Sequence, residues 1–238
     1  MRIALIGYGK MGKAIEEVAL RRGHQISLKI DQPNLHEFTK ENLSGTDLAI
    51  EFTSPHSAFD NVKILLESGV PVVCGSTGWT ERLDELKTLC EKRGGAFAYS
   101  SNFSVGVNIF FEINKKLAAL MAPHKEYEVI LEEIHHTQKK DAPSGTAITL
   151  AEQVLQEVTR KKQWVNELSD NPEDLEIISQ REDPAPGTHS VKYSSVIDTI
   201  EIIHTAHNRT GFATGAVLAA EFLRDRKGFY TMKDVLGL

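Results

Sequence analysis

The densest run of residues that could transfer protons or bind charge extends from Glu133 to Thr146, with the sequence Glu-Ile-His-His-Thr-Gln-Lys-Lys-Asp-Ala-Pro-Ser-Gly-Thr. It contains two adjacent histidines, His135 and His136, and two adjacent lysines, the first of which is Lys139. Imidazole and ammonium groups can both donate protons in an enzyme site. The run leaves an apolar stretch and enters one with helical spacing, so we expect a loop that carries chemistry.

The end of this run has the features of an anion site. Ser144 is a good N-cap for the following helix, and Gly145 has no side chain to cover the first N–H groups. Unpaired N–H groups at a helix N-terminus attract anions. Because cations lie beside this site in the sequence, we expect a substrate that carries carboxylates. A single histidine is more often structural than catalytic, so the hypothesis depends on the whole segment.

A glycine-rich loop near the N-terminus indicates a nucleotide site. Gly7-Tyr8-Gly9-Lys10-Met11-Gly12 follows a short apolar run and opens a stretch with helical spacing. In this motif the first glycine allows a tight turn, the second lets the backbone approach a pyrophosphate, and the third lets helix pack on strand. Asp31 ends the next apolar run, about 20 residues on, where a carboxylate accepts hydrogen bonds from the adenosine ribose. A purely structural glycine turn is the weaker alternative.

The residues around Asp31 bear on the choice of cofactor. A carboxylate repels the 2′-phosphate of NADPH, and the next residue is Gln32 rather than arginine. Lys10 and Lys29 are the nearest cations that could receive that phosphate. We therefore expect NADH to be favoured and NADPH to be tolerated.

Two more segments follow expected strands of the same sheet, Gly75-Ser76-Thr77-Gly78 and Ser100-Ser101-Asn102-Phe103. Ligands bind at the carboxyl ends of parallel strands, so Thr77 and Asn102 are candidates to contact the ribose or nicotinamide. Glycine, serine and asparagine also suit ordinary turns, and position alone does not separate these two readings.

These motifs need a scaffold of alternating strands and helices. Five short apolar runs read as buried strands, at Arg2–Ile6, Ile26–Ile30, Leu48–Phe52, Val72–Cys74 and Phe97–Tyr99. The helices expected between them are Met11–Arg22, a segment capped by Ser54 with Pro55 in its first turn and ending near Ser68, and Thr80–Arg93. This alternation predicts an α/β fold, a Rossmann-like doubly wound parallel sheet.

After Asn102 the pattern becomes α+β. We expect helices at Val105–Met121 and Thr146–Lys161, strands at Glu128–Ile134, His189–Val196 and Thr199–Ala206, and a polar loop over Asn166–Pro186. The last two strands read as a hairpin in a mostly antiparallel sheet. A final helix is expected at Ala213–Arg224. We thus predict a dinucleotide-binding domain of residues 1–103 and 209–238, and a substrate-binding domain of residues 104–208.

The run from His135 to Thr146 resembles the signature of the dihydrodipicolinate reductase family. The family pattern is His-His, two residues, Lys, one residue, then Asp-Ala-Pro-Ser-Gly-Thr, and this chain has it without a gap. The resemblance extends over nearly the whole chain, including the glycine loop, Glu51-Phe52-Thr53, Gly75–Gly78, Asn102–Asn108 and Phe212–Ala216.

The resemblance implies NAD(P)H-dependent reduction of 4-hydroxy-tetrahydrodipicolinate to tetrahydrodipicolinate, in the diaminopimelate and lysine pathway. It implies that His135 is the general acid/base and Lys139 a proton donor, while His136, Gly145 and Thr146 bind the dicarboxylate substrate. It also implies a homotetramer built through the sheet of the second domain.

Two features depart from the family pattern. Gln32 stands where many members have a basic residue for the 2′-phosphate, and the stretch Arg181–Val196 looks short, without the usual Gly-Glu-His loop. The first bears on cofactor choice, and the second on details of the tetramer and the edge of the substrate domain.

Composition excludes several other classes of protein. The net charge of −6 argues against nonspecific nucleic-acid binding, and no apolar run is long enough to span a bilayer. Cys74 and Cys90 cannot form a disulfide framework and lack companions at zinc spacing, so we expect no metal site and a cytoplasmic protein. Two alternatives remain: a related amino-acid dehydrogenase or imine reductase, and a dinucleotide-sensing regulator without activity.

Overall fold

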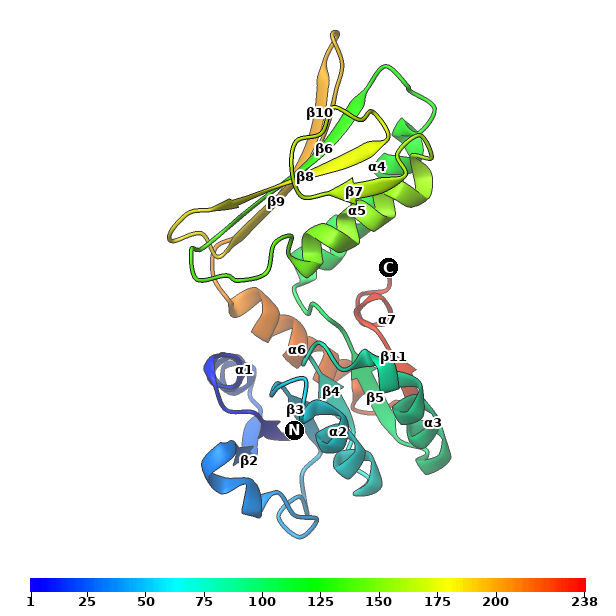
Figure 1. Cartoon of the computed structure of the whole chain (residues 1–238). Coiled ribbons are helices and arrows are strands. Elements are labelled where there is room, and N and C mark those ends of the chain that lie inside the picture. The colour runs from blue at the N-terminus through cyan, green and yellow to red at the C-terminus, as the bar shows by residue number, and fades with distance from the viewer. The chain divides into compact units, whose positions relative to one another are not determined.

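The computed structural model describes residues 1–238 and divides them into two compact units. The first joins Met1–Val105 to Arg209–Leu238, and the second is Gly106–Asn208 (Figure 1). None of the helices combines the length and the apolar character that a membrane-spanning segment needs.

The first unit is built on a six-stranded parallel sheet with the order β11-β5-β4-β3-β1-β2. Its strands are β1 (Arg2–Ile6), β2 (Gln25–Ile30), β3 (Leu48–Glu51), β4 (Val72–Cys74), β5 (Ala96–Tyr99) and β11 (Gly228–Tyr230). The chain order reverses between β1 and β3, which is where open sheets of this kind bind ligands. The predicted Rossmann-like sheet is confirmed, and the short edge strand β11 is an addition to it.

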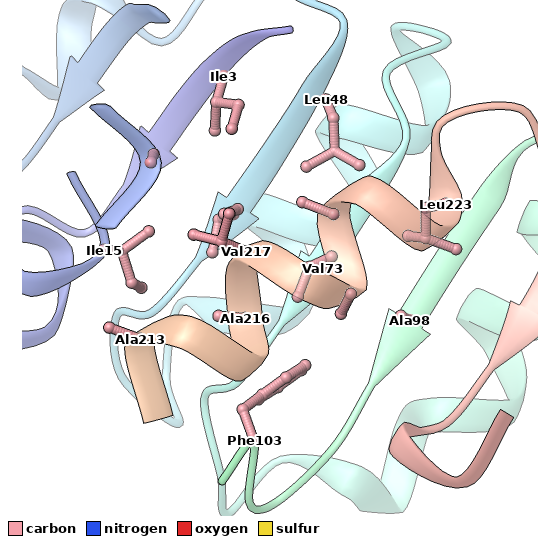
Figure 2. Close-up of a cluster of buried hydrophobic side chains, with 14 of the residues drawn as sticks. Ile3, Ile15, Leu48, Val73, Ala98, Phe103, Ala213, Ala216, Val217 and Leu223 are labelled. Carbon is pink, nitrogen blue, oxygen red and sulfur yellow. The ribbon is translucent and has the colours of Figure 1, made fainter. Parts of the chain in front are cut away.

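Helices cover both faces of this sheet. One face carries α1 (Lys10–Arg21) and α6 (Thr210–Leu223), and the other carries α2 (Ala58–Glu67) and α3 (Leu83–Arg93). Figure 2 shows Val217 and Ala216 of α6 packed near Ile15 of α1 and Val73 of β4. The close approach of α6 to the backbone of Phe103 requires a glycine at position 215, because a Cβ there would lie 1.6 Å from the carbonyl oxygen of Phe103. Helix α6 therefore completes the core of the first unit.

Shorter helical segments join these elements, namely the 3-10 helices η1 (Gln32–Glu37) and η2 (Thr80–Arg82) and the terminal helix α7 (Met232–Leu236). The predicted cap of α2 at Ser54 is wrong, because the helix begins at Ala58. The Ser54 hydroxyl instead forms a hydrogen bond with the Ser57 hydroxyl at 2.9 Å and holds a turn before the helix.

The second unit packs two helices, α4 (Val105–Met121) and α5 (Gly145–Glu157), on one face of a five-stranded sheet with the order β10-β9-β6-β8-β7. Its strands are β6 (Glu128–His135), β7 (Gln163–Val165), β8 (Asp174–Arg181), β9 (Gly187–Ser194) and β10 (Thr199–Ala206). The predicted α+β class and the β9–β10 hairpin are confirmed. The sheet is mixed rather than mostly antiparallel, because β9 pairs antiparallel with β6 and β10 whereas β8 pairs parallel with β6 and β7.

The predicted loop over Asn166–Pro186 is wrong, because this segment contains β8. Its charged residues conceal an alternating pattern in which Leu175 and Ile177 are fully buried against the helices. The strand pairs along its length with β6 and β7, so tertiary packing outweighs a polar composition.

Candidate functional site

A cavity of about 440 Å³ lies in the first unit at the carboxyl ends of β1, β3 and β4. Six of the predicted cofactor residues line it, Gly9, Lys10, Met11, Gly75, Ser76 and Thr77. The segment Phe52–Pro55 completes the wall, although sequence reasoning did not assign it to the cofactor. Of the segment Ser100–Phe103, none lines the cavity, and Phe103 is a buried core residue that packs against Phe52 at 5.8 Å between ring centroids.

The three glycines of the loop differ in what they make room for. A Cβ at Gly7 would lie 2.1 Å from the carbonyl oxygen of Phe52, and φ at Gly7 is +94°. A Cβ at Gly12 would lie 2.3 Å from the carbonyl oxygen of Gly7. At Gly9 a Cβ would meet nothing within 4 Å, so this glycine leaves open space in the cavity wall. An open cradle at the start of α1 fits the pyrophosphate of a dinucleotide.

The charged groups near the end of β2 are engaged with one another. Lys29 Nζ lies 2.6 Å from Glu16 Oε1 and donates to the Tyr8 hydroxyl at 3.3 Å. The hydrogen bond to Glu16 raises the pKa of Lys29, and the same bond lowers the pKa of Glu16. Asp31 caps η1, where its Oδ1 accepts a hydrogen bond from the Gln32 N–H at 2.9 Å. Lys10 is exposed and forms no ion pair.

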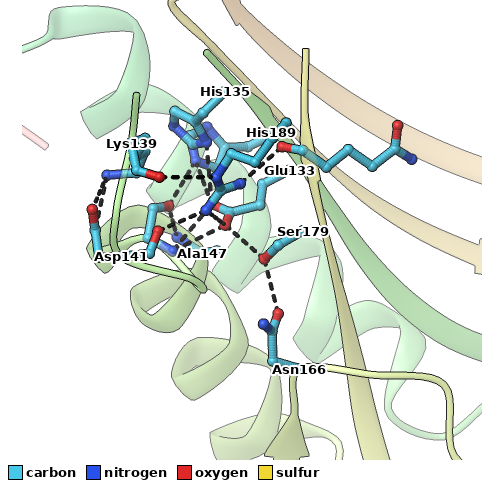
Figure 3. Close-up of polar contacts among 11 residues, drawn as sticks. Glu133, His135, Lys139, Asp141, Ala147, Asn166, Ser179 and His189 are labelled. Atoms are coloured by element: carbon cyan, nitrogen blue, oxygen red, sulfur yellow. Dashed lines mark hydrogen bonds and ion pairs between the residues drawn. The ribbon is translucent and has the colours of Figure 1, made fainter. Parts of the chain in front are cut away.

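A second polar cluster lies under α5 in the second unit, around Glu133 (Figure 3). The sheet register builds it, since Glu133 of β6 stands opposite Ser179 of β8 on one side and His189 of β9 on the other. Glu133 Oε1 accepts a hydrogen bond from Ser179 Oγ at 2.7 Å, and Oε2 lies 3.6 Å from His189 Nε2. The backbone N–H of Ser144 donates to the same carboxylate at 3.1 Å.

Glu133 is fully buried, and its environment keeps it ionised. Burial alone would raise the pKa of its carboxyl. The nearby His189 ring and the hydrogen bonds donated by Ser144 and Ser179 outweigh that effect and lower the pKa to about 2. The carboxylate is therefore charged throughout the physiological range.

His135 lies two residues along β6 on the same face, opposite Arg181 of β8. Its Nδ1 is buried, has no hydrogen-bond partner and lies 3.5 Å from Glu133 Oε2. Burial lowers the pKa of His135 to about 4, and the charges of His189, Lys139 and Arg181 act in the same direction against the opposing effect of Glu133. The imidazole is consequently neutral near pH 7.

Two of the predicted substrate residues, Gly145 and Thr146, are the first residues of α5. Ser144 caps this helix, as predicted, with its Oγ accepting a hydrogen bond from the Ala147 N–H at 3.2 Å. Gly145 is exposed, and a Cβ there would meet nothing within 4 Å. Lys139 Nζ donates to both oxygens of Asp141 at 2.8 Å. The first residue of the helix is thus exposed, and a cation lies in the preceding loop.

His136 and Thr146 belong to the same segment as these residues, and both are half-buried. The assignment of substrate contacts to them stays a prediction.

The donor atoms of Glu133, His135 and His189 lie within 4.8 Å of one another, a spacing that could suit a metal ion. The guanidinium of Arg181 lies 3.7 Å from the same carboxylate, and Ser144 and Ser179 already donate to it. A resident cation would be repelled by Arg181 and would compete with both donors. We therefore interpret the cluster as a hydrogen-bonded charge network.

The low pKa of His135 predicts a pH-dependent stability. Below the ordinary value of 6.5 the unfolded imidazole binds a proton, while the folded one does not until about pH 4. The contribution of His135 to the free energy of unfolding is thus fully present above pH 6.5 and is lost as pH falls toward 4. The total loss is at most about 3 kcal/mol. We expect the free energy of unfolding of wild type, minus that of His135→Gln, to decrease across this window in urea titrations. A difference that does not change with pH would contradict the assignment.

Sequence reasoning quoted Glu133 but gave it no role, and it missed Ser179, Arg181 and His189. Two of these three residues lie on β8, in the segment predicted to be a loop, and the third lies on β9. The cross-strand register brings them to Glu133 and His135. The only signal available was the alternation in Asp174–Arg181, which places Ser179 and Arg181 on the same face as the apolar Leu175 and Ile177.

Comparison with known proteins finds one family along nearly the whole chain. Residues 1–103 match the family model of the dihydrodipicolinate reductase N-terminus, and residues 106–236 match that of the C-terminus. The chain is 48% identical over 240 residues to a 4-hydroxy-tetrahydrodipicolinate reductase of Christiangramia forsetii, covering 99% of this chain and 98% of that protein. It is 37% identical over 221 residues to the enzyme so named in Methanosarcina barkeri, covering 91% and 81% of the two chains.

Solved structures share the fold. A dipicolinate-bound dihydrodipicolinate reductase from Paenisporosarcina sp. TG-14 superposes with a TM-score of 0.77 at 22% identity, covering 97% of both chains. An amine dehydrogenase from Mycobacterium smegmatis reaches a TM-score of 0.60 at 12% identity, covering 98% of this chain and 95% of its own. With both family models matched and a relative at 48% identity over nearly its full length, the chain belongs to the dihydrodipicolinate reductase family.

Proposed function

We propose that this protein catalyses the NAD(P)H-dependent reduction of 4-hydroxy-tetrahydrodipicolinate to tetrahydrodipicolinate, a step of diaminopimelate and lysine biosynthesis. The observation that carries the proposal is the 48% identity to a reductase of that name over 99% of the chain. The nucleotide cradle of the first unit and the anion-binding helix end of the second supply the groups that this reaction needs. The direct test is an assay of nicotinamide oxidation with freshly synthesised substrate.

The chemistry divides between the two units. NADH or NADPH, held by the glycine loop and Gly75–Thr77, supplies the hydride when bound. The 4-hydroxyl group of the substrate first leaves as water, which gives a conjugated cyclic imine. Hydride addition to this imine leaves negative charge on its carbon–nitrogen system, which a nearby proton donor must neutralise. In this proposal Lys139 donates that proton, and His135, which is neutral near pH 7, is the general acid/base. The N–H groups of Gly145 and Thr146 bind a substrate carboxylate, with His136 beside them.

The assembly proposed for the protein is a homotetramer formed through the sheet of the second unit. Support comes from exposed apolar side chains on β10 and in the turn between β9 and β10. They are Val196, Ile197, Ile200 and Ile203. We place the protein in the cytoplasm, because its two cysteines are free and buried, as is usual in reducing compartments.

NADH is the favoured cofactor in this proposal. Asp31 repels a 2′-phosphate, and Glu16 holds Lys29 in an ion pair, so the nearest cation at the end of β2 is already neutralised. We expect kcat/KM to be higher for NADH than for NADPH. A preference of tenfold or more for NADPH, about 1.4 kcal/mol, would contradict this account.

A charge-neutral substitution tests the cause of that preference. Glu16→Gln frees Lys29 and should tighten NADPH binding about fivefold, or ~1 kcal/mol, with little effect on NADH. Glu17→Gln is the matched control. It removes the same charge from the same helix, but the exposed Glu17 carboxylate contacts Arg21 instead of Lys29. Dissociation constants from nucleotide fluorescence provide the readout. Equal effects of the two variants would show that Lys29 does not receive the phosphate.

A further inference from the structure

We propose that Glu133 is a positioning residue that fixes the tautomer of His135 and ties its ring to the carboxylate-binding end of α5. The inference rests on the proposed function for the role of His135, but it concerns a residue to which neither the sequence motif nor the resemblance assigns a role. Glu133 does not face a ligand in this scheme, because it is fully buried beneath the helix.

The geometry links both functional groups to one carboxylate. Oε2 of Glu133 faces His135 Nδ1 at 3.5 Å, and Oε1 and Oε2 accept from the Ser144 N–H at 3.1 and 3.2 Å. A second connection passes through His189, whose Nε2 lies 3.1 Å from Ser144 Oγ. His189 also packs edge-on against His135, with 5.0 Å between ring centroids. Any displacement of the carboxylate would therefore move the imidazole and the helix cap together.

The same contacts select one tautomer of the neutral imidazole. Nδ1 is buried, and although the two atoms form no regular hydrogen bond, the charged Glu133 carboxylate lies 3.5 Å away, so a proton is most stable on this nitrogen. The lone pair is then on Nε2, to which no side chain of the protein donates. Nε2 is left to accept a proton or a hydrogen bond from a ligand, whereas Lys139 is the group that donates. A buried acid that orients a catalytic imidazole in this way is a known device of enzyme sites.

Two surrounding groups explain why this carboxylate remains charged without protonating His135. Ser179 Oγ donates to Oε1 at 2.7 Å, and the guanidinium of Arg181 lies 3.7 Å from it. Lys139, Arg181 and His189 all disfavour a positive charge on the His135 ring. Glu133 thus acts as a fixed negative charge rather than as a proton carrier.

The test combines spectroscopy with kinetics on the full-length protein. His135 is observed by NMR after selective ¹⁵N-histidine labelling, and its signals are identified by their loss in His135→Gln. Wild type should show the Nδ1–H tautomer. Glu133→Gln should shift His135 toward the Nε2–H form and lower kcat at least about tenfold while circular dichroism stays unchanged. Glu152→Gln, an exposed residue of α5 with the same loss of charge, should change neither.

The outcomes separate this inference from the proposed function. An Nε2–H tautomer in wild type overturns it, and so does a Glu133→Gln protein in which either the tautomer or kcat is unaltered. If Glu133→Gln does not fold, the tautomer of the wild-type ring decides alone. A wild type that shows the Nδ1–H tautomer but does not reduce the substrate would refute the proposed function and leave the structural role of Glu133 standing.

Discussion

Removing the imidazole of His135 or the ammonium of Lys139 is expected to lower kcat by about 10²–10⁴-fold, the usual contribution of a general acid or base. His135 ends β6 on its buried face, whereas Lys139 lies in the loop before α5, where its ammonium pairs with Asp141. His135→Gln and Lys139→Ala introduce side chains no larger than the native ones, so both variants are expected to fold. Steady-state kinetics and circular dichroism on each variant provide the measurement.

Neighbouring residues supply the controls for this experiment. Lys140→Ala removes the adjacent, exposed ammonium, and His36→Gln removes an exposed imidazole of the first unit, so both should retain wild-type kcat. Thr146→Val should mainly raise KM, because a carboxylate at the start of α5 is bound in both the ground state and the transition state. If His135→Gln and Lys139→Ala both fold and keep wild-type kcat, neither residue carries the chemistry.

Substitutions in the glycine loop are expected to have the second large effect. One should weaken nucleotide binding, and the other should destabilise the fold. Gly9→Val should fold normally, since a Cβ there meets no atom within 4 Å, but its side chain would occupy the cradle of the cavity. We expect nucleotide affinity to fall at least about 100-fold, or ~2.7 kcal/mol. Gly12→Ala should instead destabilise the fold, because its Cβ would lie 2.3 Å from the Gly7 carbonyl oxygen.

Thermal unfolding and nucleotide titration distinguish the two glycine variants. Gly9→Val should keep the wild-type melting temperature and lose binding, whereas Gly12→Ala should melt earlier. A Gly9→Val protein that binds NADH as tightly as wild type would show that the phosphates do not approach this glycine.

Local sequence signals predicted the first unit well. Strands such as Val72–Cys74 are short apolar runs in a fully buried parallel sheet, and Gly7, Gly9 and Gly12 stand at a strand-to-helix turn where the motif has a physical reason. The start of α2 was misplaced because the Ser54–Ser57 turn has the same residue types as a helix cap.

The second site was only half predictable from the sequence. His135, Lys139 and Ser144 lie in one continuous segment, so their pattern was visible. Ser179 and His189 are more than 40 residues away from Glu133 in the chain and reach it only through strand register. Register depends on which face each strand buries, and the charged residues of Asn166–Pro186 obscured the alternation in Asp174–Arg181 that marks β8.

The reaction itself is the most direct test of the account. Purified protein is mixed with 4-hydroxy-tetrahydrodipicolinate made in a coupled synthesis, and oxidation of NADH and of NADPH is followed by absorbance. The account predicts substrate-dependent oxidation of both nucleotides, faster at limiting concentration with NADH, and a rate that collapses in His135→Gln. Folded wild-type protein that binds NADH but oxidises neither nucleotide in the presence of this substrate would contradict the proposed function.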